Sequence, residues 1–207
     1  MFGGDEQEGL PPLDYIRQAC ANIGPGHDFD YSLQTLKEDR KAFFISCWHL
    51  FELETAEMWE IHGPAGVAIV SRYSALQSIL DTLPDRTFLG RVRYGLKPHR
   101  YNTLHFITTK RPDFVNEQEV RALIWRPELS DRNPYPHDTP NGLEHPFEVQ
   151  RLIEGVVVSP RAPAGRLREI ESLLGSLGHS IPVRESGLTS YAALLPELKD
   201  IKRLSSK

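Results

Sequence analysis

The stretch Ala42-Phe43-Phe44-Ile45-Ser46-Cys47-Trp48 decides the fold of this chain. It is short, aromatic and almost continuously apolar, which predicts a buried β-strand. Residues 119–125, Glu-Val-Arg-Ala-Leu-Ile-Trp, predict a second strand for the same reasons. Shorter strands are expected over 66–71, 88–94, 156–159 and 181–183. The chain therefore contains enough strand-forming sequence for at least one sheet.

Helical patterns are interspersed with these strands. Pro11-Pro12 opens a helix over 13–23, and Gly24-Pro25-Gly26 ends it. Further helices are expected over 33–41, where Ser32 is the N-cap, and over 53–62, 74–83, 166–177 and 191–195. The periodicity of 105–108 fits either a weak strand or a helix end. Because there is no strict β-α-β alternation, the predicted class is α+β, with a mixed or antiparallel sheet flanked by helices.

Length and composition predict a single domain over residues 1–198. A chain of 207 residues buries a substantial core without disulfides or metal, and 40% hydrophobic with 25% charged residues argues against disorder. Five prolines with Asn141-Gly142 predict a long surface loop over 127–146. A basic tail follows at 199–207.

The cysteines and the apolar stretches indicate the compartment. Cys20 and Cys47 form no Cys-x-x-Cys pair, so no disulfide framework is expected, and Cys47 inside an apolar run is expected to be buried and inert. The start of the chain is acidic and glycine-rich, unlike a signal peptide. The longest apolar stretch, 42–48, is far shorter than the roughly 20 residues that span a bilayer. A cytoplasmic protein without a membrane partner is expected.

Several short motifs follow one another in a recognisable order. They are Phe44-Ile-Ser-Cys-Trp48, Glu57-Met-Trp59, His62-Gly63, Gly66-Val-Ala-Ile69, Val92-Arg-Tyr94, Lys110 with Phe114, Glu117-Gln-Glu119-Val-Arg121, Val156-Val-Val-Ser-Pro160, and Val183 with Ser186-Gly-Leu188. This order resembles the bacterial domain of unknown function 2971. The resemblance covers most of the chain, and it implies a bacterial protein associated with phage defence or toxin systems.

The start of the chain departs from that pattern. Phe2-Gly-Gly-Asp5 with Glu8-Gly9 resembles a turn that lies further inside the domain in the family. We therefore expect an upstream β-element to be missing, because the chain starts late.

Glu117, Glu119 and Arg121 form the main catalytic candidate. If Glu117 already belongs to the strand, all three side chains share one face, and Val120, Ala122 and Ile124 form the core face. Paired carboxylates can act as a general base or hold a ribose hydroxyl. With Ser46 on an earlier strand, the group resembles an ADP-ribosyltransferase site, which implies NAD as a cofactor. The alternative is a solvated strand face that carries a surface ion network.

Two further groups are weaker candidates. Trp48 and Trp59, with Met58, could sandwich a base or a nicotinamide ring, although core packing is the commoner use of such a stripe. Cys47 with His49 or His62 could form a nucleophile and base. No metal is expected, because the eight histidines show no paired ligand spacing.

Residues 86–111 contain no acidic side chain. The basic side chains there are Arg86, Arg91, Arg93, Lys97, Arg100, Lys110 and Arg111, interleaved with aromatic residues. Such a stretch suits a nucleotide or single-stranded nucleic acid, with Arg91, Arg93 and Lys110 as ligand-binding candidates; the alternative is a solvated face that complements acidic segments.

Two functions stay open from the sequence. The first is a nucleotide- or nucleic-acid-directed effector of the ADP-ribosyltransferase type. The second is a non-catalytic interaction or sensor domain whose motif residues are structural.

Overall fold

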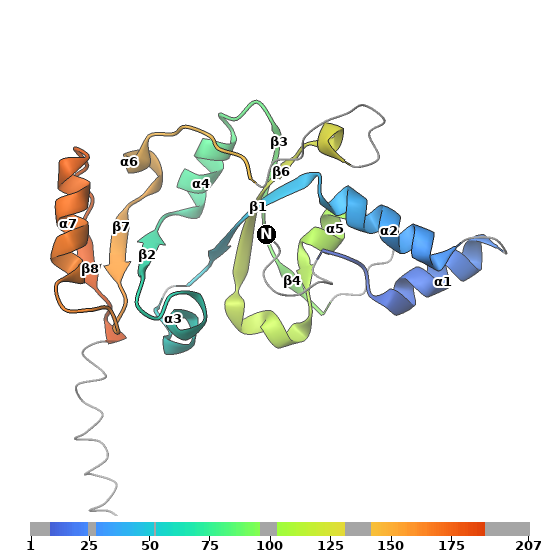
Figure 1. Cartoon of the computed structure of the whole chain (residues 1–207), viewed down its shortest axis with the longest axis horizontal. Coiled ribbons are helices and arrows are strands. Elements are labelled where there is room, and N and C mark those ends of the chain that lie inside the picture. Colours follow the sequence, from blue (N-terminus) through green and yellow to red (C-terminus); the bar gives the residue numbers. More distant parts are fainter. Residues whose placement is uncertain (1–8, 25–27, 52, 96–102, 131–141, 189–207) are drawn as a thin grey trace, which may run out of the picture. The chain divides into compact units, whose positions relative to one another are not determined.

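The computed structural model describes residues 9–24, 28–51, 53–95, 103–130 and 142–188. Helices combine with antiparallel and mixed sheets, which confirms the α+β class (Figure 1). The chain divides into two compact units: the first is drawn from 1–50 and 80–145, the second from 51–79 and 146–207. Each unit has its own three-stranded sheet. The domain boundaries predicted at 1–198 stay a prediction.

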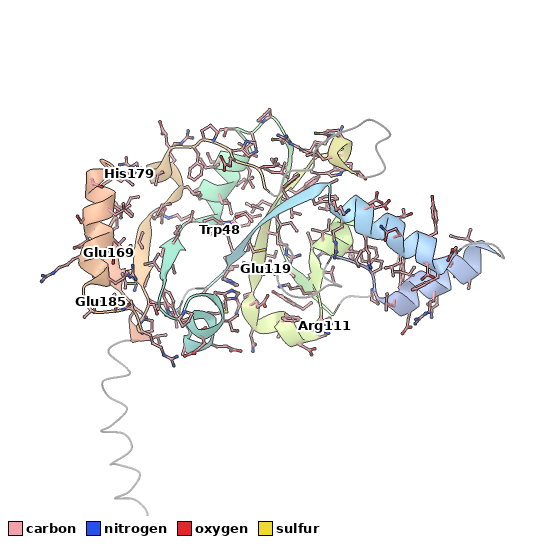
Figure 2. The ribbon with its side chains drawn as sticks, in the orientation of Figure 1. Trp48, Arg111, Glu119, Glu169, His179 and Glu185 are labelled. Carbon is pink, nitrogen blue, oxygen red and sulfur yellow. The ribbon has the colours of Figure 1, made fainter. Side chains whose placement is uncertain are left out.

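The sheet of the first unit has β6 (Glu119–Trp125) at its centre. β1 (Phe43–His49) and β3 (Arg86–Arg91) flank it, and both run antiparallel to it. The register places Cys47 of β1 and Gly90 of β3 opposite Arg121. Trp48 and Glu119, labelled in Figure 2, come from β1 and β6. The predicted bounds of β6 are confirmed, and those of β1 are shifted by one residue.

Both faces of β6 are buried. Val120 and Ala122 are buried as expected, and Ile124 is partly buried. On the opposite face, Leu123 joins a core cluster with Ala42, Phe43 and Ile107, packed further by Ile45, Leu104 and Trp125. The face that carries Glu119 and Arg121 is therefore a core face too. The alternative of a solvated strand face is wrong, because α5 (Thr103–Ile107) packs there through Ile107.

The chain between β3 and β6 is more irregular than its sequence predicts. The strand predicted over 88–94 is split into β3 and the short β4 (Arg93–Tyr94), which pairs in parallel with β5 (Thr109–Lys110). Residues 105–108 belong largely to α5. Along the chain, one 3-10 helix, η1 (Pro112–Glu117), precedes β6, and another, η2 (Pro127–Leu129), follows it.

The first unit begins with a helix pair. α1 (Leu13–Ile23) and α2 (Phe29–Arg40) share an apolar cluster of Ile16, Cys20 and Leu36. The predicted start of α2 after Ser32 is wrong: Asp28 caps the helix, and its carboxylate accepts from the Asp30 amide at 2.8 Å. Ser32 lies inside the helix, where its hydroxyl accepts a hydrogen bond from the Cys20 thiol.

The second unit contains a mixed sheet in the order β2-β7-β8. β7 (Gly155–Val158) pairs antiparallel with β2 (Val67–Val70) and parallel with β8 (Val183–Glu185). Its described residues form the helices α3 (Ala56–His62), α4 (Tyr73–Leu80), α6 (Val149–Leu152) and α7 (Arg166–Ser176). The buried residues Val156, Val157 and Val158 make β7 the core strand of this unit.

Some predictions fall outside the described residues. They are the turn at residues 2–5, most of the loop predicted over 127–146, the helix over 191–195, the tail 199–207, and Lys97 and Arg100. Within the part of the chain that is described, no helix has the length and apolar character needed to cross a membrane.

Candidate functional site

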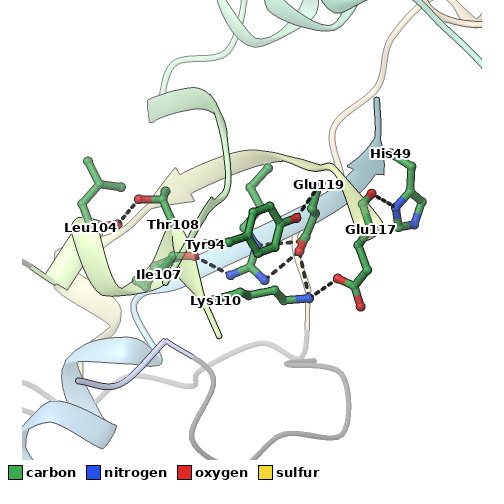
Figure 3. A network of polar contacts seen from close by, with 9 residues as sticks. His49, Tyr94, Leu104, Ile107, Thr108, Lys110, Glu117 and Glu119 are labelled. Carbon is green, nitrogen blue, oxygen red and sulfur yellow. Dashed lines mark hydrogen bonds and ion pairs between the residues drawn. The ribbon is translucent and has the colours of Figure 1, made fainter. Parts of the chain in front are cut away.

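Glu119 and Arg121 form an ion pair in the interior of the first unit. They are two residues apart on β6, so their side chains lie on the same face, and 2% and 1% of these side chains are exposed. Arg121 Nε donates to Glu119 Oε1 at 2.7 Å, and Arg121 Nη2 donates to Oε2 at 3.1 Å. Arg121 Nη1 also donates to the backbone carbonyl of Ile107. The guanidinium therefore connects β6 to the end of α5 (Figure 3).

Lys110 brings Glu117 to this pair. Its Nζ atom contacts Glu119 Oε2 at 2.9 Å and Glu117 Oε2 at 2.6 Å, and about 15% of the Lys110 side chain is exposed (Figure 3). Glu117 itself is not in the strand, so the assumption that strand alternation aligns it is wrong. It ends η1, and Gln118 follows in the left-handed region at φ 42° before β6 begins. The carboxylates of Glu117 and Glu119 lie close together because both contact the Lys110 ammonium, and not because strand alternation places them on one face.

The surroundings keep Glu119 ionised. Burial raises the pKa of its carboxyl, but hydrogen bonds and charge from Arg121, followed by hydrogen bonds from Cys47 and Lys110, outweigh burial and lower the pKa to about 2. A carboxylate with such a pKa is a weak base at neutral pH. Its two oxygens each already accept from a cation.

Tyr94 also forms a hydrogen bond with Glu119. Its hydroxyl accepts from the backbone N–H of Glu119 at 2.9 Å. Burial raises the pKa of the Tyr94 phenol, and the negative charges of Glu119 and Glu117 raise it further. Tyr94 is thus a neutral partner of the network at physiological pH. No local pattern in the sequence predicts this contact.

Cys47 and His49 lie on the network's side of the sheet. In the register they stand opposite Arg121 and Glu119. The Cys47 thiol donates to the Glu119 carboxylate, and His49 Nδ1 donates to the Glu117 carbonyl at 2.9 Å. The expectation that Cys47 is buried is wrong, since the residue is exposed.

Ser46 and Trp48 lie on the other face of the same sheet. They alternate with Cys47 and His49 along β1, and Trp48 Nε1 donates to Ser46 Oγ at 3.0 Å. Their cross-strand partners are Ala122 and Val120, not Glu119. The serine and the Glu-x-Glu carboxylates, which together suggested a transferase site, therefore do not converge.

Trp59 belongs to the second unit, in α3. Its indole Nε1 donates to Glu54 Oε2 at 3.2 Å. Glu54 also accepts from the buried Ser186 hydroxyl, from Arg184 Nη1 at 2.7 Å and from the Gly187 amide at 3.3 Å. Burial raises the pKa of Glu54, but the bonds from Ser186, Arg184, Gly187 and Trp59 lower it overall.

Sequence reasoning missed Glu54. Its partners lie 5 and 130 or more residues away along the chain, so no local spacing indicated the contact. In the sequence, the Ser186-Gly-Leu188 motif is the feature that could have pointed to this contact. Ser186 Oγ also accepts from the Leu188 amide at 3.2 Å, which closes the turn around the carboxylate.

The described part of the basic stretch is mostly exposed. Arg86, Arg91, Arg93 and Arg111 are exposed, whereas Lys110 is largely buried against two carboxylates. Arg86 lies over the Trp125 ring at 5.1 Å, and Arg111 over the Phe114 ring at the same distance. Arg91 ends β3 and Arg93 begins β4, so two exposed guanidinium groups lie close in sequence at this junction.

A cleft of about 580 Å³ lies elsewhere in the first unit. Its lining includes Asp39, Phe43, Trp125 and Glu128, but not Glu117 or Glu119. The described residues also contain no group of three or more His, Cys, Asp or Glu side chains arranged to hold a metal ion.

A scan against protein-family models, a search of curated proteins and a search of solved structures each gave no match.

Proposed function

We propose that this protein is a non-catalytic binding domain that recognises a nucleotide or nucleic acid through the exposed arginines of residues 86–111. In this proposal Glu119, Arg121 and Lys110 are structural, and they hold β4, β5 and β6 together beside the binding surface. The observation that carries the proposal is that Glu119 is buried and that both of its carboxylate oxygens already accept from a cation, Oε1 from Arg121 and Oε2 from Lys110.

The charges around the network separate into two classes. Lys110 and Arg121 are neutralised inside the unit by Glu117 and Glu119. Arg91 and Arg93 are exposed in a stretch that contains no acidic residue. Phe88, which is 37% exposed, lies on the same face of β3 as the exposed Arg86, and an arginine beside an aromatic ring suits the phosphates and bases of a single strand.

The order of motifs along the chain supports membership of the bacterial domain of unknown function 2971. With that membership we propose a cytoplasmic bacterial protein that acts in phage defence or a related conflict system. The absence of Cys-x-x-Cys pairing fits the reducing compartment that this proposal requires.

Binding is tested by fluorescence anisotropy with a labelled single-stranded oligonucleotide over a range of salt concentrations. The double variant Arg91→Glu/Arg93→Glu should weaken binding by about tenfold or more, and the salt slope should fall by about one for each phosphate that is no longer bound. Arg168→Glu, which reverses an exposed charge on α7, is the matched control and should bind normally. Equal binding by the double variant and the control would show that Arg91 and Arg93 do not contact the oligonucleotide.

One observation favours a second function, an ADP-ribosyltransferase-like enzyme that uses NAD. The carboxylates of Glu117 and Glu119 both contact Lys110 Nζ, so they lie close enough for a ligand that displaces the ammonium to meet both. Nicotinamide release from NAD tests this second function. Glu117→Gln is the informative variant, because Glu117 is more exposed than Glu119 and its loss should leave the unit folded. Release that depends on Glu117 would support the enzyme.

A further inference from the structure

The edge strand β2 (Val67–Val70) lacks the features that usually protect a sheet edge. It contains no charged residue, no proline and no bulge, and Val67, Ile69 and Val70 are 40%, 50% and 39% exposed. The other edge of the same sheet, β8, carries Arg184 and Glu185 and follows Pro182. Charged side chains and proline are common protection against pairing between edges. The sheet is thus protected on one edge only.

The hydrogen bonds between β2 and β7 show which backbone groups of β2 face β7 and which face outward. The carbonyls of Gly66 and Val70 accept from the Ser159 and Glu154 amides at 3.1 and 2.9 Å, so they point toward β7. Groups alternate along an antiparallel strand, so the N–H and C=O groups of Val67 and Ile69 point away from β7. Among the described strands, β7 is the one that pairs with β2. The outward groups of Val67 and Ile69 therefore form a short template for another strand.

We propose that this edge pairs with β2 of a second copy of the chain, antiparallel about a two-fold axis at Ala68. In that register Val67 faces Ile69 of the second copy and exchanges both backbone hydrogen bonds with it, and the reverse pair does the same. Every outward backbone group of Val67 and Ile69 is then satisfied. Two β-branched pairs also form, and such cross-strand pairs stabilise a sheet.

A second copy fits this strand because the sequence is self-complementary. Residues 64–71 carry no charge, so a two-fold axis at Ala68 brings no like charges opposite each other. The outward groups are confined to two residues that pair with each other under that symmetry. The two sheets then continue into one, which removes the exposed edge from both copies. The inference is independent of the function proposed above, because it concerns the other unit.

Sedimentation analysis of the full chain tests the association. The protein should form dimers in a concentration-dependent manner. Ile69→Pro should be monomeric, because its missing N–H is one that points away from β7. At dilutions where the original chain is also monomeric, the two proteins should melt at the same temperature. Ile69→Val, which keeps the N–H and the β-branched side chain, should dimerise like the original chain. If Ile69→Pro fails to fold, Ile69→Lys serves instead, because lysine on an edge opposes pairing.

Cross-linking tests the register. In a Cys47→Ser background, Ala68→Cys should form an intermolecular disulfide, because residue 68 faces itself at a non-hydrogen-bonded position, where Cα atoms about 4.5 Å apart fit a disulfide. Val70→Cys is the control and should not cross-link, since it faces Gly66. A chain that stays monomeric at all concentrations, a dimer that persists in Ile69→Pro, or equal cross-linking at residues 68 and 70 would overturn the proposal.

Discussion

The Lys110 ammonium contacts the Glu117 carboxylate at 2.6 Å across the turn of η1, seven residues further along the chain. The same ammonium contacts Glu119, so the short β5 is tied to both ends of the turn that leads into β6. Gln118, in the left-handed region between the two glutamates, makes this arrangement possible. The result is a compact ion network in which two carboxylates face two cations.

Glu119→Gln should destabilise the protein strongly. The substitution leaves the Arg121 guanidinium, 1% exposed, without its carboxylate, and breaking a buried pair by removing one partner costs about 3–5 kcal/mol. The free energy of unfolding measured in urea checks this value. Glu117→Gln, at a side chain that is 17% exposed, is the matched control and should cost clearly less. Equal stability of Glu119→Gln and the original chain would show that the pair is not structural.

Stability should fall in acid because of Glu119. Its pKa is about 2 in the folded protein against an ordinary value of 4.5, so the unfolded chain binds the proton first as the pH falls. The contribution is fully present above about pH 4.5 and is lost as the pH falls toward 2; it amounts to about 3 kcal/mol. Urea unfolding at pH 7, 4 and 3 measures it. The Glu119→Gln variant should show a flatter dependence, and parallel curves for the two proteins would assign the acid sensitivity to other groups.

Only one of the two thiols should react readily. Cys47 is exposed, whereas Cys20 is buried in the α1–α2 cluster and donates to Ser32 Oγ. A chromogenic disulfide reagent should therefore release one equivalent quickly from the native protein and the second only on unfolding. Cys47→Ser should abolish the fast phase. A fast phase that survives this substitution would mean that the helix pair opens to expose Cys20.

Ser186→Ala should weaken the second unit. The hydroxyl is in a residue only 3% exposed; it donates to Glu54 and accepts from the Leu188 amide. Removing it leaves a partly buried carboxylate with one donor fewer, at a cost of about 1–3 kcal/mol. Thermal and urea unfolding report the loss. Arg184→Gln removes a partner whose side chain is 58% exposed, and it should change stability by less than about 1 kcal/mol. If Arg184→Gln lowered the stability more than Ser186→Ala, the ion pair with Arg184 would be the contact that contributes most to holding Glu54.

The sequence predicted the strands better than the network. The bounds of β6 are confirmed because a run of β-branched and apolar residues is a local signal. The position of Glu117 was not predictable, because a left-handed glutamine has no sequence signature comparable to glycine. The burial of Arg121 depends on the Ile107 carbonyl, 14 residues upstream, and on the packing of α5. Charged residues in a strand predict a solvated face unless such long-range partners are known.

The strand order of the first sheet also determines when it can assemble. β1 and β3 both pair with β6, the last of the three along the chain, and not with each other. During synthesis on the ribosome, residues 43–49 and 86–91 emerge before any strand exists to receive them. β2 similarly emerges long before β7. Nascent chains of this protein therefore expose unpaired strands until residue 158 has left the exit tunnel, and we expect them to bind chaperones that recognise extended apolar segments.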